Sequence, residues 1–201
     1  MGWGNGDSTV MASELHVDAI KHSGGTSAVT INSSGVVHIP GHIIQVTHAI
    51  KTDTATINSA AGTAFVDTGL NCSITPKFAS SLIMVNATVA IGSSTSAFAY
   101  FKMMRNIAGG TYAMSVAPDA AGARPLVHGF EYHDANPGNG PNAQSFVAVE
   151  SLSTTSVVNF KVQMGGSGSG DITINKSSRD NASTDYDGRS SSRIILMEIA
   201  Q

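Results

Sequence analysis

Charged residues are scarce in this chain, and cysteine and tryptophan each occur once. Asp, Glu, Lys and Arg make up 12% of the 201 residues, and the formal net charge is −3. The 11 Lys and Arg residues are scattered and form no basic stripe, so we do not expect nucleic acid as a partner. The lone Cys72 in "GLNCSITP" cannot form an intramolecular disulfide. We expect it to be a small buried hydrophobe without redox chemistry.

Long apolar runs are missing as well. No segment approaches the roughly 20 apolar residues of a membrane-spanning helix, so we expect no membrane insertion. The first residues, "MGWGNGDSTVMASE", lack the basic and apolar regions of a signal peptide. A role outside a cell would then require another route of release, such as lysis. No stretch combines a long apolar stripe of helical period with helix caps, so any helix should be short.

Turn formers and β-branched residues dominate instead. Hydrophobic residues make up 41% of the chain and glycine contributes 21 residues, a composition too apolar for disorder and too rich in turn formers for helices. The segments "SLIMVNATVAIG" and "SVVNFKVQMGG" alternate apolar and polar residues with a period of two, as half-buried strands do. Six further segments are candidate strands: 42–50, 96–106, 125–134, 143–152, 171–177 and 192–200.

About eight to ten strands are typical of a β-sandwich of jelly-roll type. We therefore predict an all-β protein whose residues 41–201 form a jelly-roll-like antiparallel β-sandwich. A flexible N-terminal anchor (1–13) and a short extended or β stalk segment (14–40) should precede it. The last candidate strand, "SRIILMEIA", is apolar on both faces, which predicts that both are covered. Loops of the same chain or a neighbouring subunit could provide that cover.

Two strand-like runs with Gly and Ser turns make up residues 17–37. An isolated pair of strands is marginal in water, because ordering each residue costs ~1–2 kcal/mol and a hairpin buries little surface to offset it. The segment should borrow its core from elsewhere, and three copies around a common axis would supply one. The residues predicted to line this trimer axis are Leu15, Val17, Ile20, Val29, Ile31, Val36 and Ile39.

The pattern "LHVDAIKHSGGTSAVTINSSGVV" resembles the short repeat that opens or precedes the terminal domain of many bacteriophage tail-fibre and virion structural proteins, especially from phages of aquatic bacteria. The runs "FVDTGLNCSITPKFASSLIMVNATVAIG", "FKMMRN", "ITINKSSRD" and "SSSRIILMEIA" resemble the domain that commonly follows it. The resemblance implies a trimeric virion component with an N-terminal attachment segment and a C-terminal β-sandwich, and it implies no catalytic residues. The chain lacks the long shaft of typical fibres, which leaves both a fibre and a capsid decoration protein open.

Histidines offer two conceivable metal sites. His38 and His42 in "HIPGH" flank a Pro-Gly pair, which precludes the helix that would bring both side chains onto one zinc ion. Three copies of one axial histidine, from His16, His22 or His38, could hold a metal on a threefold axis. We expect exposed or hydrogen-bonded histidines instead, and therefore no metal.

Other polar clusters also fall short of catalytic or cofactor sites. "FEYHD" places Glu131 and His133 on one face of a strand, without an activated nucleophile nearby. "RDNASTDYDGRS" gathers three carboxylates without the spacing of an EF-hand, and "GGSGSG" lacks the Lys and Ser/Thr of a phosphate loop. A depolymerase would need a long β-helix, for which the chain is too short. We predict a protein that is not an enzyme, with no catalytic residues and no cofactor.

Surface recognition requires no motif, because sugars are bound by an aromatic face beside Asn and Asp side chains. Two predicted loops have this composition, although a plain polar turn explains each equally well. The residues predicted as possible receptor contacts are Tyr132, Asp134, Asn136, Asn139, Asn142, Arg179, Asp180, Tyr186 and Asp187.

Together these features predict a bacteriophage virion structural protein located in the virion. We expect a tail fibre or tail tip protein that takes part in host surface attachment, with a capsid cement or decoration protein as the alternative. The expected partners are further copies of the chain in a homotrimer, the tail hub, baseplate or major capsid protein, and a glycan or protein of the host surface. Trp3, on a glycine-rich tether, is the candidate virion anchor, although a disordered terminus would explain it as well.

Overall fold

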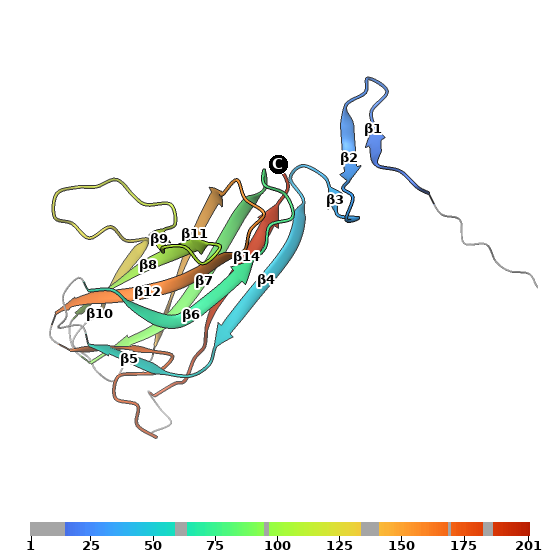
Figure 1. Cartoon of the computed structure of the whole chain (residues 1–201). Coiled ribbons are helices and arrows are strands. Elements are labelled where there is room, and N and C mark those ends of the chain that lie inside the picture. Colours follow the sequence, from blue (N-terminus) through green and yellow to red (C-terminus); the bar gives the residue numbers. More distant parts are fainter. Residues whose placement is uncertain (1–14, 59–63, 95–96, 134–140, 169, 183–186) are drawn as a thin grey trace, which may run out of the picture. The chain divides into compact units, whose positions relative to one another are not determined.

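The computed structural model describes residues 15–58, 64–94, 97–133, 141–168, 170–182 and 187–201. Secondary structure in these ranges consists of β-strands and isolated bridges, as the composition predicts (Figure 1). No helix in the described ranges is long and apolar enough to cross a membrane. The chain divides into two compact units at the boundary between Ile39 and Pro40.

The first unit is an antiparallel meander of three strands, one more than the sequence predicts. Its strands are β1 (Ala19–Lys21), β2 (Ser27–Ile31) and β3 (Val37–His38). Gly25 and Gly35 take φ values of 87° and 75° in the two turns, a conformation that strongly favours glycine. In the second turn the Asn32 side chain accepts hydrogen bonds from the amides of Ser34 and Val36.

This meander contains no buried side chain among its described residues. Leu15 is 80% exposed and Ile20 is also exposed. The other residues assigned to the trimer axis are half-buried: Val17, Val29, Ile31, Val36 and Ile39. The described part of the unit thus has no core of its own, and the shared axis of three copies stays a prediction.

The second unit holds the remaining strands. They are β4 (Ile43–Lys51), β5 (Ala55–Asn58), β6 (Val66–Ile74), β7 (Leu82–Ser93), β8 (Ala97–Ile107), β9 (Ala113–Met114), β10 (Gly129–His133), β11 (Asn142–Ser151), β12 (Val158–Gly168), β13 (Asp171–Ile174) and β14 (Ser192–Ile199). Each predicted strand segment contains one of them. Three strands, β5, β6 and β9, lie outside the predicted segments, and β10 occupies only the second half of its predicted segment.

In three cases, two consecutive strands share one position in a sheet, as if a single strand were interrupted by a short connection. These pairs are β4 with β5, β9 with β10, and β13 with β14. Residues 82–88 of β7 pair with β14 and residues 91–93 pair with β13, while β11 pairs along residues 82–91. β10 and β9 likewise pair with successive parts of β8, whose other neighbour is β12.

Two antiparallel sheets result. One has the order β11, β7, β14/β13, β4/β5, and the other has the order β10/β9, β8, β12, β6. Strand positions that follow each other along the chain alternate between these sheets except at the step from β8 to β9/β10, which gives the two Greek keys of a jelly roll. The predicted fold class, a jelly-roll-like antiparallel β-sandwich, is confirmed.

The core lies between the two sheets and comes mainly from the inward positions of β7, β8, β12 and β14. These side chains include Ile83, Val85, Val89, Phe101, Met103, Phe160, Val162, Ile194 and Leu196. Cys72 is half-buried at the margin of this core, with its Sγ atom 3.5 Å from Thr47 Oγ1, so it is less buried than expected.

Glu198 is a fully buried carboxylate near the end of β14. Its Oε1 atom accepts hydrogen bonds from Lys77 N (2.8 Å), Phe78 N (3.0 Å) and Ser81 Oγ (2.8 Å). Gln45 Nε2 donates to Oε2 at 2.6 Å. These bonds supply the partners that a buried charge requires, and they fasten the β6–β7 connection to the last strand.

Candidate functional site on the two sandwich surfaces

The outer face of the β11, β7, β14, β4 sheet is largely apolar, and its polar members are His48, Asn86, Thr88, Ser145 and Arg193. Strand register places Val149, Met84, Met197 and Val46 side by side in one row across the four strands. We define the apolar face as Ile43, Val46, Ile50, Leu82, Met84, Val147, Val149, Ile195, Met197 and Ile199. Its five residues on the edge strands β4 and β11 are 45–60% exposed.

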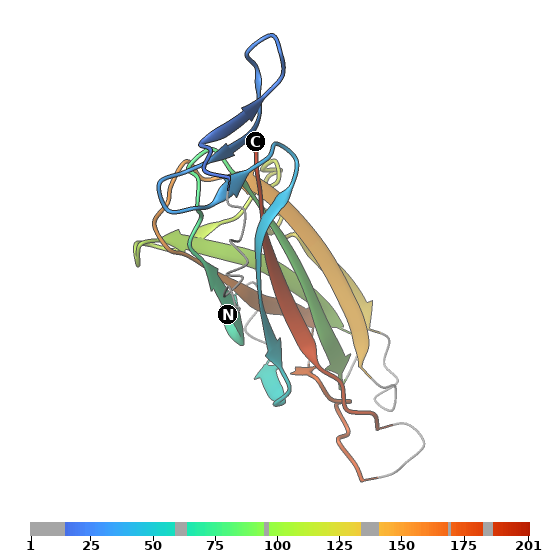
Figure 2. The same ribbon diagram turned by 90° about the vertical axis from the view of Figure 1, so that its right-hand side faces the viewer.

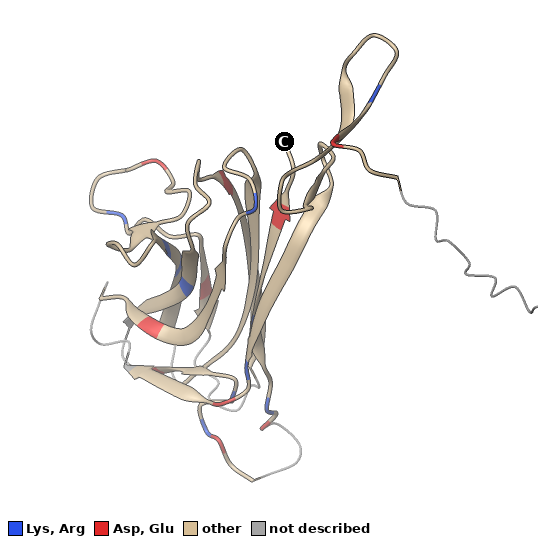
Figure 3. Ribbon diagram, turned by 45° about the vertical axis from the view of Figure 1, so that its right-hand side comes forward, with Lys and Arg blue, Asp and Glu red and all other residues tan. Residues whose placement is uncertain are grey.

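Charge is nearly absent from this face. Of the charged residues on these four strands only Arg193 is exposed, because Lys51 and Glu198 are buried and the Glu150 side chain is 10% exposed. Figure 2 shows the sheet from this side with no described segment of the second unit laid across it, and Figure 3 shows its strands almost entirely tan. Described loops of the second unit therefore do not provide the cover that the doubly apolar last strand predicts.

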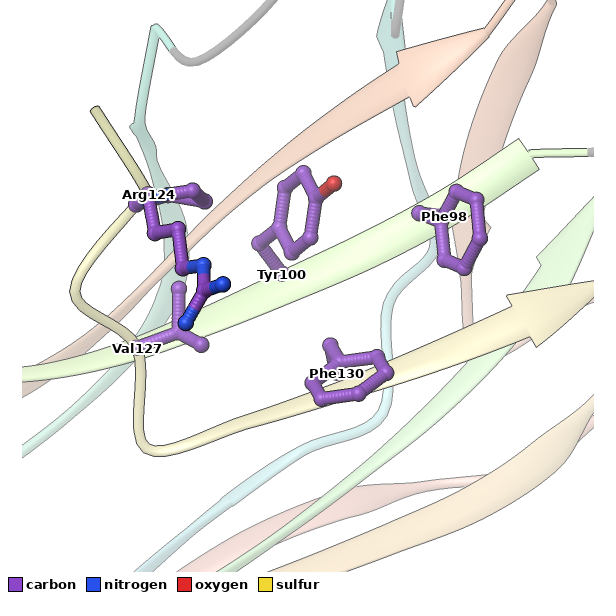
Figure 4. Close-up of a pocket in the computed structure, with 6 residues that line it drawn as sticks. Phe98, Tyr100, Arg124, Val127 and Phe130 are labelled. Carbon is purple, nitrogen blue, oxygen red and sulfur yellow. The ribbon is translucent and has the colours of Figure 1, made fainter. Parts of the chain in front are cut away.

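The other sheet carries an aromatic groove on its outer face (Figure 4). The groove has a volume of about 260 Å³ and is lined by Phe98, Tyr100, Arg124, Pro125, Val127 and Phe130. Phe98 and Tyr100 alternate with inward residues on β8, and Phe130 lies opposite Tyr100 on β10. The remaining three residues come from the connection between β9 and β10.

Aromatic rings form most of the groove surface. The Phe98 and Tyr100 rings are parallel to within 3°, with their centroids 6.3 Å apart. The Phe130 ring is tilted by 56° to that of Phe98, and the Phe130 residue is 64% exposed. Tyr132 extends the cluster, because its ring centroid lies 4.9 Å from that of Phe98. Exposed aromatic clusters of this kind are uncommon on monomer surfaces and mark binding sites.

His128 holds the connection that forms one wall of the groove. Its Nδ1 atom accepts a hydrogen bond from Met103 N at 3.0 Å, so Nε2 carries the proton and donates to the Ser115 carbonyl. Ser115 Oγ in turn donates to Glu150 Oε1 at 2.6 Å, and Arg105 Nε donates to Glu150 Oε2 at 2.9 Å. Burial lowers the pKa of His128, and the Ser115 carbonyl and the Glu150 carboxylate partly oppose this shift.

Two cations accompany the aromatic rings. Arg124 is exposed and makes no ion pair within the part of the chain that the structure describes. Lys102 follows Tyr100 on the same face of β8, and its Nζ atom lies 3.7 Å from the centroid of the Phe65 ring. Burial lowers the pKa of Lys102. No acidic side chain lines the groove, so its surroundings favour an anion.

Glu131 and His133 share the inward face of β10, as the sequence predicts. Glu131 Oε2 and His133 Nε2 are 3.7 Å apart, and both atoms are buried without a hydrogen-bond partner. Burial lowers the pKa of His133, against the opposing effect of Glu131. Asn142 Nδ2 donates to Glu131 Oε1 at 3.1 Å. No group of three or more potential metal ligands exists among the described residues.

The first predicted receptor loop differs from expectation. Tyr132 and Asn142 are strand residues of β10 and β11, because period-two pairing extends further than the turn-like composition suggests. Tyr132 still lies on the surface, next to the aromatic groove. Other predicted residues lie outside the described ranges: Trp3, Asp134, Asn136, Asn139 and Tyr186.

Charges in the second predicted receptor loop pair with one another. Arg179 Nη2 lies 2.8 Å from Asp187 Oδ2, and the Asp187 side chain is only 1% exposed. Hydrogen bonds from Ser177 and Arg179 lower the pKa of Asp187. Asp180 forms ion pairs with Lys176 and Arg189. These contacts shape the loop, and its contact with a receptor stays a prediction.

Sequence reasoning missed the groove residues Phe98, Tyr100, Arg124 and Phe130. One signal was available, because "SAFAYFKMMRN" is apolar on both faces of a strand, as the last strand is. Phe101 and Met103 occupy the inner face, which leaves Phe98 and Tyr100 outside. No local signal could place Arg124 beside them.

No family model matches the chain, and no curated protein matches its sequence. Among solved structures it is similar to Eiger TNF from S. frugiperda, with 10% identity over 86% of this chain and 69% of that chain, at a TM-score of 0.30. It is also similar to the structure of infectious bursal disease virus Gx strain, with 11% identity over 92% of this chain and 42% of that chain, at a TM-score of 0.41. The chain thus spans less than half of that viral chain. These distant likenesses carry no information about function.

Proposed function

We propose that the protein is a structural component of a bacteriophage virion that assembles as a homotrimer and takes part in attachment to the host surface. The apolar face carries this proposal, because an extended sheet face that is largely apolar and carries little charge is a surface that proteins cover with a partner. The resemblance of residues 15–37 and of the terminal segment to phage tail-fibre and virion proteins supports the virion setting. The aromatic groove supports a role in surface binding.

Burial of the apolar face would contribute substantially to association. Fully burying a Val or Ile side chain stabilises by about 1.5–3 kcal/mol, so each half-exposed edge residue is worth about 1 kcal/mol. Five edge residues then contribute about 5 kcal/mol per subunit, which must exceed the loss of rotational and translational freedom. The meander of residues 19–38, which lacks a buried side chain, adds a second apolar surface for the same partners.

Analytical ultracentrifugation at micromolar concentration tests the assembly. The parent protein should sediment as a trimer, and V46D or V147D should sediment as a monomer, because each places a carboxylate within the apolar face. V66D is the matched control, since Val66 is an exposed valine on the other sheet. A stable parental monomer, or trimers of both face variants, would refute the assembly through this face.

Capsid cement remains the second candidate, because an apolar face also suits a subunit that clamps neighbouring capsid proteins. Copy number per virion separates the two roles. Quantitative mass spectrometry of purified particles should find a few dozen copies or fewer for a tail protein and hundreds for a cement protein. A protein that is not present in particles at all would refute both.

A further inference from the structure

The aromatic groove presents flat aromatic faces on which the apolar face of a ligand ring can pack. The rings of Phe98 and Tyr100 are parallel, and the ring of Phe130 lies against that of Phe98. A pyranose offers apolar C–H faces that pack on such rings, while its hydroxyl groups stay in water at an open rim. The groove volume of about 260 Å³ lies below that of pockets for drug-sized ligands, about 300–1,000 Å³, so one sugar ring is enough to fill it.

The charge of the groove selects among sugars. Figure 4 shows the Arg124 side chain reaching past Val127 toward the space beside Tyr100 and Phe130. Its guanidinium has no ion-pair partner in the described part of the chain, and a guanidinium matches a carboxylate with two parallel hydrogen bonds. Lys102, the next outward residue on β8, adds positive potential along the same face.

We infer that the groove binds a sugar acid, a pyranose that carries a carboxylate, with the ring packed on Phe98, Tyr100 and Phe130 and the carboxylate bound by Arg124. An apolar side chain of a partner protein fits less well. Such side chains usually insert into enclosed pockets, and one placed here would leave the Arg124 guanidinium unpaired. The inference rests on the proposed attachment role, since sugar acids would be presented by the host surface.

Calorimetric titration of the full chain with matched pairs of methyl glycosides tests the inference. Methyl glucuronide and methyl galacturonide are compared with methyl glucoside and methyl galactoside, which differ from them only in having a hydroxymethyl group in place of the carboxylate. At least one acid should bind about tenfold or more tightly than its neutral partner, as expected for a charge-assisted pair. If neither acid is preferred, the inference is wrong.

Three variants locate the site. R124Q should lose the preference for the acid, about tenfold in Kd, while its affinity for the neutral sugar stays the same. F130A should weaken both sugars, because it removes ring contact. K77Q removes an exposed cation on the β6–β7 connection and should change neither affinity. Thermal melting checks that each variant is folded, and a folded R124Q that keeps the preference overturns the inference.

Binding of the parent protein to host cells separates this inference from the attachment role. Preference for a sugar acid without cell binding would support the groove and refute attachment. Cell binding by a protein without any preference for the acids would support attachment and overturn the inference.

Discussion

Mild acid should loosen the wall of the aromatic groove through His128. In the folded protein the Nδ1 atom of His128 accepts the Met103 amide and Nε2 donates to the Ser115 carbonyl. A second proton on the ring would set an N–H group against the Met103 N–H and remove that hydrogen bond. This geometry agrees with the lowered pKa that burial gives His128.

The sign and size of the effect follow from proton linkage. Histidine in the unfolded chain takes up its proton near pH 6.5, whereas folded His128 stays neutral to lower pH. Its contribution to stability is therefore complete above about pH 6.5 and is lost as the pH falls from there through the folded pKa. Within that window the free energy of unfolding should fall by up to about 1.4 kcal/mol per pH unit for each such histidine. His133, whose pKa burial also lowers, adds a slope of the same sign.

Urea unfolding followed by far-UV circular dichroism between pH 5 and 8 measures this slope. Protein concentration must be held constant, because association changes apparent stability. H128N keeps an acceptor for the Met103 amide but cannot take up a proton, so its slope should be smaller than that of the parent by up to about 1.4 kcal/mol per pH unit. At pH 8 it should lose about 0.5–1.5 kcal/mol with the bond to Ser115. If the pH slope of H128N equals the parental slope, the reasoning is refuted. The slope of H133N, measured in the same way, shows how much of the parental slope comes from His133.

Further predictions concern the loops, the groove and the N-terminus. E198Q should lower the free energy of unfolding by about 2–4 kcal/mol in urea titrations, because an amide nitrogen would face buried N–H donors in place of a carboxylate oxygen. Y132A should lose about 0.5–1.5 kcal/mol of stability with its ring contact to Phe98 and should bind host cells less well, and unchanged cell binding would exclude Tyr132 from the receptor site. Deleting residues 1–13 should leave the trimer intact in sedimentation but prevent incorporation into particles, whereas normal incorporation would place the anchor elsewhere. Elemental analysis of the purified trimer should find no stoichiometric metal.

Local periodicity in the sequence determined the strands and the class of the fold. Alternation in residues 82–93 and 158–164 decides which side chains enter the core, because successive residues of a strand point to opposite faces. The same logic identified β14 as apolar on both faces, and the cover of its outer face by a neighbouring subunit stays a prediction. Short strands such as β5 and β9 carried too few residues for the period to be recognised.

Only the tertiary structure decided which strands became neighbours, and the functional surfaces depend on that choice. Val46, Met84, Val149 and Met197 form one row because β4, β7, β11 and β14 pair in a particular register, and each strand would look the same in sequence with another neighbour. The groove likewise depends on the path of the connection between β9 and β10, which places Arg124 beside the aromatic residues of β8. Strand pairing is a long-range choice set by packing of the whole core, so no local pattern in the sequence records it.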